Sequence, residues 1–170
     1  MAFTKIQTVS LGSNASEIEF TAIPSTYKDL YMLLNVRCAN ATNRQSVILT
    51  FNNNTSDYYR ARGYAYDSVP TFGGDNAASQ ADAALGSANG TLVGADFYSP
   101  MEVYIFSYAS SAANKTFHSR FGAVSGSTSA WVNGFGHFAW ANSSAINSIK
   151  LVFDLNNFVS GSTASLYGIS

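Results

Sequence analysis

The sequence contains very little charge. Only 11% of its 170 residues are Asp, Glu, Lys or Arg, and the formal net charge is -1, whereas charged residues make up about 25% of a typical soluble domain. A surface with so few charges produces no strong electrostatic field, so steering of charged ligands and binding to phosphate backbones are not expected. Polarity comes instead from Ser, Thr, Asn and Gly. The composition therefore argues against a nucleic-acid partner.

Cysteine and long apolar runs are also scarce. The single cysteine, Cys38, excludes an internal disulfide, and its position after the apolar "LLNV" predicts a buried small side chain. No segment approaches the roughly 18–20 apolar residues of a membrane span. Residues 1–13 lack the apolar stretch of a secretory signal peptide. We therefore expect a protein that is made in a cytoplasm, is not exported through a signal peptide and has no membrane partner.

Aromatic residues, by contrast, are abundant at 14%, mostly Tyr and Phe, and they favour β-structure. Apolar and polar residues alternate with a period of two in segments such as 17–23, 101–109 and 115–124, as in half-buried strands. About ten such segments follow one another with turn residues at short spacing. This pattern predicts one all-β domain over residues 1–170, an antiparallel β-sandwich or barrel.

Two segments receive specific predictions within this pattern. Residues 27–39 are apolar on both faces over part of their length, which favours a central strand covered on both sides, with a helix as the alternative. Residues 163–169 follow a Gly-Ser turn and alternate like a strand, so we expect them to close the sandwich from inside a sheet. Truncation of the last six residues should then destroy the fold.

Residues 67–90 break the pattern, because they are rich in Ala, Gly, Ser and Asn. Within them, "DNAASQADAAL" is able to form a short helix, with Asp75 as its N-cap and Gly86 at its C-terminal end. We therefore expect a long excursion between strands that reaches a neighbouring molecule, since long loops often carry function. Deletion of residues 72–88 should then weaken assembly and leave the fold intact.

Candidate catalytic groups are few. His118 and His137 each lie in a strand pattern among aromatic residues, and a single cysteine cannot complete a zinc site with them. Glu17 and Glu19 share a strand face roughly 7 Å apart, a separation found in glycosidases. Two solvent-facing carboxylates that protect a sheet edge explain the same pattern more simply. We therefore predict a non-enzymatic protein with no catalytic residue, metal or cofactor.

A dense run of tyrosine and arginine suggests a binding surface, because these residues anchor many protein interfaces. A half-buried strand with outward tyrosines is an equally open alternative. Trp131 lies in a turn-like segment and is expected to be exposed, where it could stack on a sugar, whereas Trp140 is expected in the core. The candidate interface residues are Tyr58, Tyr59, Arg60, Arg62, Tyr64, Tyr66 and Trp131.

Several blocks of the sequence resemble small virion proteins of tailed bacteriophages. The blocks cover residues 1–37, 46–59, 103–122, 145–154 and 158–169, the last containing "GSTASLYGI". The resemblance extends over nearly the whole chain outside 67–90, and it includes no catalytic motif. It implies a jelly-roll-like β-sandwich that serves as a structural part of the virion, assembled in the host cytoplasm.

Two roles are compatible with this resemblance. The first is a capsid decoration or cement protein that binds the outer face of the major capsid protein shell, as a homotrimer at points of local threefold symmetry. The second is the tip or a module of a tail or head fibre, which binds a host-surface glycan. Because the strand pattern begins by about Lys5, with no shaft or coiled coil before it, decoration is the favoured expectation.

Overall fold

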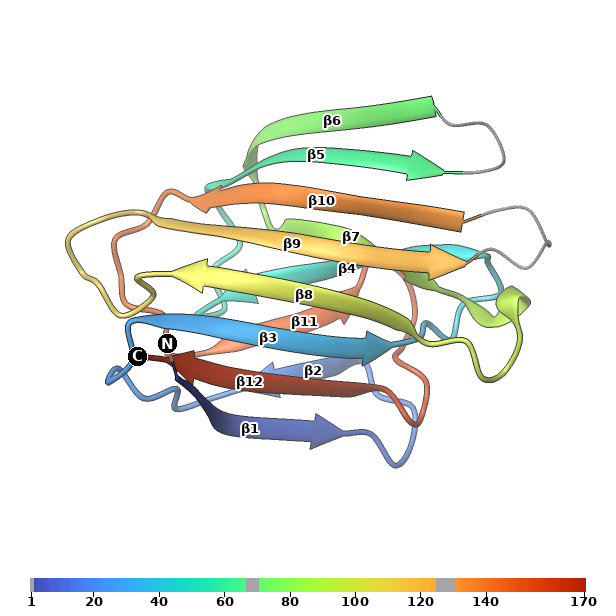
Figure 1. The fold of residues 1–170 in the computed structure, drawn as a ribbon, viewed down its shortest axis with the longest axis horizontal. Coiled ribbons are helices and arrows are strands. Elements are labelled where there is room, and N and C mark those ends of the chain that lie inside the picture. The colour runs from blue at the N-terminus through green and yellow to red at the C-terminus, as the bar shows by residue number, and fades with distance from the viewer. Residues whose placement is uncertain (1, 67–70, 125–130) are drawn as a thin grey trace.

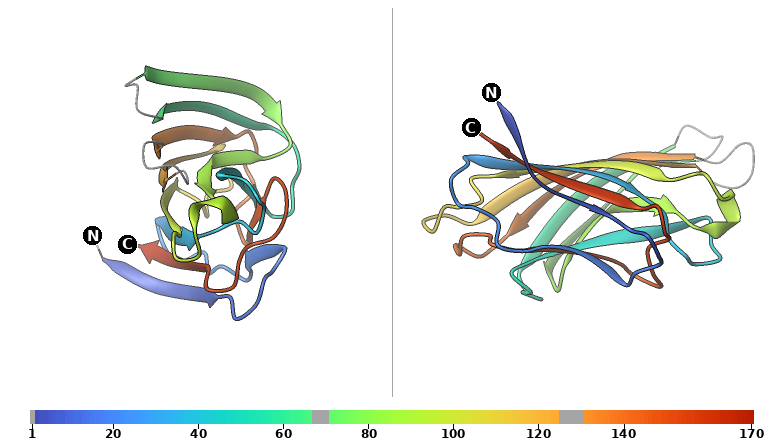
Figure 2. Two further views of the ribbon diagram at one scale, coloured as in Figure 1. Left: turned by 90° about the vertical axis from the view of Figure 1, so that its right-hand side faces the viewer. Right: turned by 90° about the horizontal axis from the view of Figure 1, so that it is seen from below.

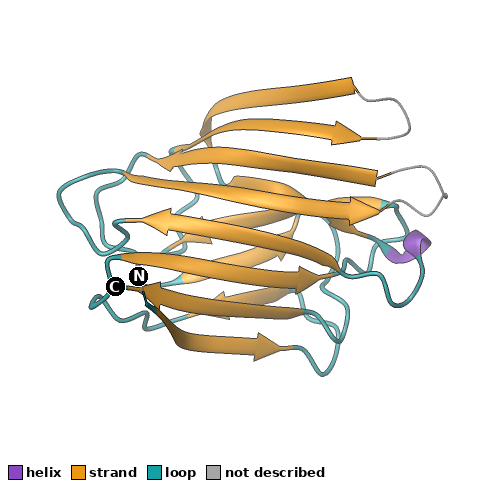
Figure 3. Ribbon diagram, in the orientation of Figure 1, coloured by secondary structure: helices purple, strands orange, loops and turns teal. Residues whose placement is uncertain are grey.

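The computed structural model describes residues 2–66, 71–124 and 131–170, and it confirms an all-β sandwich made of two antiparallel sheets (Figure 1, Figure 3). The described strands are β1 (Phe3–Ser10), β2 (Glu17–Phe20), β3 (Asp29–Val36), β4 (Arg44–Phe51), β5 (Tyr58–Tyr66), β6 (Thr71–Gln80), β7 (Ala83–Asn89), β8 (Ser99–Phe106), β9 (Lys115–Val124), β10 (Trp131–Trp140), β11 (Ile149–Phe153) and β12 (Thr163–Ile169). The one described helix is η1 (Thr91–Val93), a single 3-10 turn, so no described helix is long and apolar enough to cross a membrane.

Eight of these strands follow the path of a jelly roll. One set is ordered β1-β12-β3-β8 and the other β2-β11-β4-β7, and among these eight strands the chain changes set at every step except from β4 to β7. In Figure 1 the first set lies in front of the second. This arrangement of two stacked four-stranded layers defines the jelly-roll sandwich. The β-sandwich predicted from the strand spacing is therefore confirmed, as is the jelly-roll-like arrangement that the resemblance implies.

Two additional hairpins enlarge only the first sheet. β9 and β10 follow β8, and β5 and β6 follow β4, and the two hairpins meet through β10 and β5. The larger sheet therefore has the order β1-β12-β3-β8-β9-β10-β5-β6. We call β9, β10, β5 and β6 the extension. In Figure 1, β5 and β6 lie above the region backed by the smaller sheet.

The prediction of a long excursion with a helix at residues 67–90 is wrong wherever the structure describes these residues. Positions 71–80 and 83–89 form β6 and β7, and Asp75 is in a strand rather than at a helix N-cap. β7 carries buried Ala83, Leu85 and Ala88 into the core. The many small residues in this segment therefore do not indicate a loop. In β7 they allow the two sheets to pack closely. Deletion of 72–88 should therefore destroy the fold, contrary to the sequence-based expectation.

The hydrophobic core lies between the two sheets. In β3 the alternate residues Leu30, Met32, Leu34 and Val36 are buried, as the two-residue period of a strand requires. From the other sheet, β4 and β11 supply their own buried alternate residues: Val47, Leu49, Phe51, Ile149, Leu151 and Phe153. Burial of such side chains stabilises the fold by about 1.5–3 kcal/mol for each large residue.

A cluster of aromatic rings joins the extension to this core. Phe51 of β4 contacts Phe117 of β9 and Trp140 of β10, with ring centroids 5.0 and 5.5 Å apart. The Tyr58 ring of β5 stacks on Trp140 at 6.1 Å, and its hydroxyl accepts a 2.7 Å hydrogen bond from the Phe51 main-chain N–H. Trp140 is buried, as expected from the sequence.

Phe121 of β9 forms a second connection between the sheets. A Cβ added at Gly86 of β7 would lie 2.2 Å from Cδ1 of the Phe121 ring, and one at Gly134 of β10 would lie 2.5 Å from its Cζ. Both glycines are therefore required by the close approach of this ring. The ring packs against a strand of the smaller sheet and a strand of the extension.

The strand predicted at residues 163–169 is present and lies inside the larger sheet. β12 pairs with β1 on one side and β3 on the other, and Leu166 and Ile169 are buried. The N–H of Ser170 donates to the carbonyl of Ala2 at 3.3 Å. The two ends of the chain consequently lie side by side, as both views in Figure 2 show.

Local predictions at two other places, Cys38 and the pair Glu17 and Glu19, are also confirmed. Cys38 is fully buried. Asn52 and Asn53 adopt left-handed backbone with φ of 53° and 54° in the turn between β4 and β5, which asparagine tolerates better than most residues. Glu17 and Glu19 lie in β2, at an edge of the smaller sheet, and Glu17 Oε2 lies 3.6 Å from Lys150 Nζ of β11.

Candidate interaction face

The outer face of the larger sheet carries a row of rings in direct register. Tyr167, Tyr31, Tyr104, His118 and His137 lie opposite one another on β12, β3, β8, β9 and β10. Their successive ring centroids are 6.4, 6.4, 5.6 and 6.0 Å apart. Directly opposed side chains on neighbouring strands stabilise each other. Contacts between neighbouring rings therefore stabilise the row, although no second layer of described strands covers it.

Exposed apolar side chains gather around the part of this row that lies on the jelly-roll strands. We call this group the aromatic patch: Phe3, Tyr31, Leu33, Tyr104, Phe106 and Tyr167. Phe3 is 54% exposed, and Leu33 and Phe106 are each 40% exposed. A contiguous group of exposed apolar side chains of this kind marks a surface that a partner can cover. The prediction that residues 27–39 are covered on both faces is therefore wrong on the outer face, although β3 is a central strand.

Asp29 fixes the geometry at one end of the patch. Its Oδ2 accepts a 3.0 Å hydrogen bond from the Tyr104 hydroxyl, and its Oδ1 accepts a 2.7 Å bond from the Ser107 main-chain N–H. Burial and the Asp29 carboxylate together raise the pKa of Tyr104. The Tyr104 ring also contacts the Phe106 ring at 4.6 Å. The patch is thus a preorganised surface rather than a set of independent side chains.

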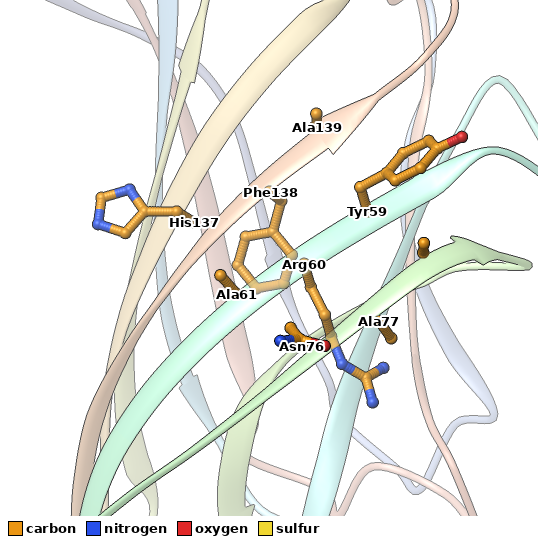
Figure 4. A pocket seen from close by; sticks show the side chains of 9 residues that line it. Tyr59, Arg60, Ala61, Asn76, Ala77, His137, Phe138 and Ala139 are labelled. Atoms are coloured by element: carbon orange, nitrogen blue, oxygen red, sulfur yellow. The ribbon is translucent and has the colours of Figure 1, made fainter.

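A series of shallow hollows follows the same face onto the extension. The largest, about 420 Å³, is lined by residues of β5, β6 and β10 (Figure 4). Because side chains alternate along each strand, Tyr59, Ala61, Asn76, His137 and Ala139 reach this hollow from the outer side. Its floor is made of alanines, and its rim carries one ring, one imidazole and one amide.

Three smaller hollows adjoin it. One of about 280 Å³ is shared by His118, Arg120, Phe135 and His137, and another of about 310 Å³ by Arg120, Asn133 and Phe135 together with small residues of β5. A fourth, of about 220 Å³, lies towards β8. We call the four hollows together the groove. Phe135, which is 44% exposed, stands between the second and third hollows.

The groove carries little net charge. Glu102 of β8 and Arg120 of β9 lie directly opposite each other. The pKa of His118 is lowered by burial and by the neighbouring His137 and Arg120, so His118 is neutral at pH 7. The His118 ring stacks on Tyr104 with an interplanar angle of 18°. Aromatic faces and neutral hydrogen-bonding groups therefore dominate this half of the outer face.

The predicted Tyr/Arg interface does not form one surface, because strand alternation divides it between the two faces of β5. Tyr59 and Trp131 are exposed on the outer face, at 39% and 40%. Tyr58 is buried against Trp140, so the prediction of an interface role for its side chain is wrong. The side chain of Tyr66 lies outside the described residues.

Arg60, Arg62 and Tyr64 point to the inner face instead. Arg60 and Arg62 both bind Asp75 of β6: Nε of Arg60 donates to Oδ1 at 3.3 Å, Nε of Arg62 donates to Oδ1 at 3.0 Å, and Nη2 of Arg62 donates to Oδ2. Arg62 Nη1 also donates to the Ala84 carbonyl of β7 at 3.1 Å. Hydrogen bonds from Arg62 lower the pKa of Asp75. Arg60 and Arg62 therefore join β5 to β6, and Arg62 also joins the extension to β7 of the smaller sheet.

Sequence reasoning missed most residues of the aromatic patch, because they come from four strands that are distant along the chain. One signal was present: the outward positions of β3 and β8 are Tyr31, Leu33, Tyr104 and Phe106, so both faces of these strands are apolar. Such strands are either covered twice or bear a binding surface. Only the sheet order shows which applies.

Comparisons with known proteins give no family for this chain. No family model and no curated protein matches it. Among solved structures, it is similar to a chain described as "Structure of infectious bursal disease virus Gx strain", with 10% identity over 98% of this chain and 39% of that chain, at a TM-score of 0.14. The chain thus spans well under half of that protein, and a TM-score this low supports no shared fold.

Proposed function

We infer that this protein is a non-enzymatic structural component of a tailed-bacteriophage virion. In this proposal it is a decoration protein, located in the virion, that binds the outer face of the major capsid protein shell through the aromatic patch. The resemblance of the sequence blocks to phage virion proteins supports a location in the virion. The exposed patch on a rigid sheet carries the proposal of a docking surface.

The composition of the patch suits a protein partner. Tyrosine and other aromatic side chains contribute large contact areas at low entropic cost, and they are enriched where interfaces are strongest. The ring contacts and the Asp29 hydrogen bonds already hold the patch in one arrangement, so little side-chain freedom is lost on docking. The proposed unit on the shell is a homotrimer, which matches points of local threefold symmetry.

Cosedimentation of purified protein with empty capsids tests this function. Wild-type protein should bind at a copy number set by the shell lattice, and Leu33→Asp should abolish binding because it places a second carboxylate in the patch, directly opposite Glu102. Leu33 is exposed on an outer strand face, so this variant should keep its fold, which circular dichroism can check. Tyr59→Ala, outside the patch, is the matched control and should bind normally.

Salt dependence gives a second measurement. None of the six patch residues is an acid or a base at neutral pH, so binding should change little when salt is raised. Binding that disappears at high salt, or equal binding by Leu33→Asp and wild type, would contradict docking through the patch. Binding to tail fibres or host cells in place of capsids would instead favour the fibre role. Mass photometry that shows only monomers would contradict the trimer.

A further inference from the structure

The four hollows of the groove form one continuous feature. The first and second share His137, the second and third share Arg120 and Phe135, and the third and fourth share Arg120 and Asn133. Along β10 they extend from Ala139 to Asn133, roughly 20 Å at the rise of a β-strand. A site of this length, with repeated shallow hollows, suits a linear polymer rather than one compact small molecule.

A peptide does not fit this site well. Peptides that bind sheets usually add as a strand at an edge, where main-chain N–H and C=O groups are unpaired. The groove instead lies over β10, which pairs with β9 on one side and β5 on the other, and over β5, which also pairs with β6. The main-chain groups of these inner strands are already used within the sheet. An extended peptide would therefore find no ladder to join except at the outer edge of β6, which the groove reaches only at Asn76, Ala77 and Ala78 of its first hollow.

A nucleic acid does not fit either. Sites for single strands combine aromatic stacking with a row of positive charges that follows the phosphates. The groove has Arg120, but Glu102 lies opposite it on β8, and the pKa of His118 is lowered. Arg60, whose main chain reaches the first hollow, binds Asp75 through its guanidinium. One compensated arginine over roughly 20 Å cannot neutralise a phosphate backbone.

We propose that the groove binds a linear, neutral polysaccharide. The C–H faces of sugar rings pack on aromatic side chains, which Tyr59 and Phe135 present at 39% and 44% exposure. Sugar hydroxyls both donate and accept hydrogen bonds, and the amides of Asn76 and Asn133 and the imidazole of His137 do the same. The small side chains of Ala61 and Ala139, which face outward in the first hollow, leave room for a sugar ring. This site is separate from the aromatic patch.

Isothermal titration with maltohexaose, cellohexaose, mannohexaose and chitohexaose tests the proposal on the purified full-length protein. At least one hexasaccharide should bind, and its affinity should exceed that of the matching monosaccharide by more than about tenfold, because several hollows are filled together. Failure of all four to bind at millimolar concentration would overturn the proposal. Equal affinity for monosaccharide and hexasaccharide would also overturn it, since the site would then be a single pocket.

Three variants assign the binding to the groove. Phe135→Ala should weaken hexasaccharide binding by about tenfold, and Ala61→Glu should block the first hollow from an exposed position that leaves the fold intact. Phe3→Ala is the matched control, because Phe3 is a similarly exposed ring on the same face and packs on Tyr31, outside the groove. Equal losses in Phe135→Ala and Phe3→Ala would show non-specific adhesion and refute the site. Capsids are absent from this assay, so it can fail while the decoration role stands.

Discussion

The larger sheet has two halves that are held in place differently. Strands β12, β3 and β8 lie over the smaller sheet, and their inner side chains are buried apolar residues. In the extension, β5 and β6 are held by main-chain pairing, by the Tyr58 ring in the aromatic cluster, and by Arg60 and Arg62, which bind Asp75. The first half depends on hydrophobic burial, and the second also depends on polar contacts at its outer margin. Core mutations should therefore cost far more stability than mutations in β5 and β6.

The largest loss should follow from Phe51→Ala. Phe51 is fully buried and contacts the rings of Phe117, Tyr58 and Trp140. Its removal should cost about 3–5 kcal/mol of unfolding free energy, because a large cavity forms where core and extension meet. Urea denaturation followed by fluorescence measures this value. A loss below about 1 kcal/mol would contradict the proposed role of the cluster in joining the two halves.

Gly134→Ala should cost less, about 1–3 kcal/mol. The added Cβ would lie 2.5 Å from Cζ of Phe121 and 2.8 Å from the main-chain oxygen of Gly63, and the second of these cannot move away easily. Gly12→Ala is a suitable control, because nothing lies within 4 Å of its added Cβ. Thermal melts of the two variants should differ clearly. Equal melting temperatures would show that the Phe121 ring of β9 does not pack tightly against β10.

Asp75→Asn should destabilise the extension by about 1–2 kcal/mol, since it weakens charged hydrogen bonds from two arginines. The folded-state pKa of Asp75 is lowered, so its contribution is present above its ordinary pKa and is lost as the pH falls through the folded value. The difference between variant and wild type should therefore shrink below about pH 4. Asp96→Asn, at an exposed position in the loop between β7 and β8, is the control. A difference that is unchanged at low pH would exclude this ion pair as the cause.

The smallest effect should come from His118. Its folded-state pKa is lowered, so the unfolded chain binds the proton more readily and stability falls as the pH drops below about 6.5. Because His118 is only partly buried, this loss should stay below about 1 kcal/mol, or about 4 °C in melting temperature. His118→Gln should lose this pH dependence, while Tyr104, Arg120, Glu102 and His137 remain beside it. A variant that keeps the full dependence would assign it to one of those neighbours.

The contrast between the halves also explains which predictions succeeded. In the jelly-roll half, β2 and β12 alternate, and β3 is apolar on both faces and bounded by turn residues, so the strands and the closing position of residues 163–169 were predictable from the sequence. In the extension, β6 has Gly and Ala where strands usually carry branched residues. These small residues are explained by close packing and by the shallow hollow on the outer face. Intrinsic strand propensity predicts neither of these features. Alternation alone explains why Tyr58 and Arg60 lie on the inner face of β5 and Tyr59 lies on its outer face.

The candidate surfaces were less predictable than the fold. Phe3, Leu33 and Phe106 are far apart in the sequence, and they come together only through the order β1-β12-β3-β8. That order depends on pairings between distant strands, for which a single sequence contains no signal. The composition did limit the kind of binding surface. Because the chain has so few charged residues, aromatic and amide side chains are left to make most contacts with a partner.

The position of β12 has a consequence for how the chain reaches its native state. β12 lies between β1 and β3, yet the ribosome synthesises it after every other described strand. Until it emerges, β1 has no neighbour in the larger sheet and one edge of β3 is unpaired. Nascent chains would therefore expose unpaired strand edges that are prone to aggregation. Folding should also be slow, because the β1–β12 pairing joins residues from nearly opposite ends of the chain. Expression at reduced temperature, which slows aggregation of such intermediates, should raise the soluble yield.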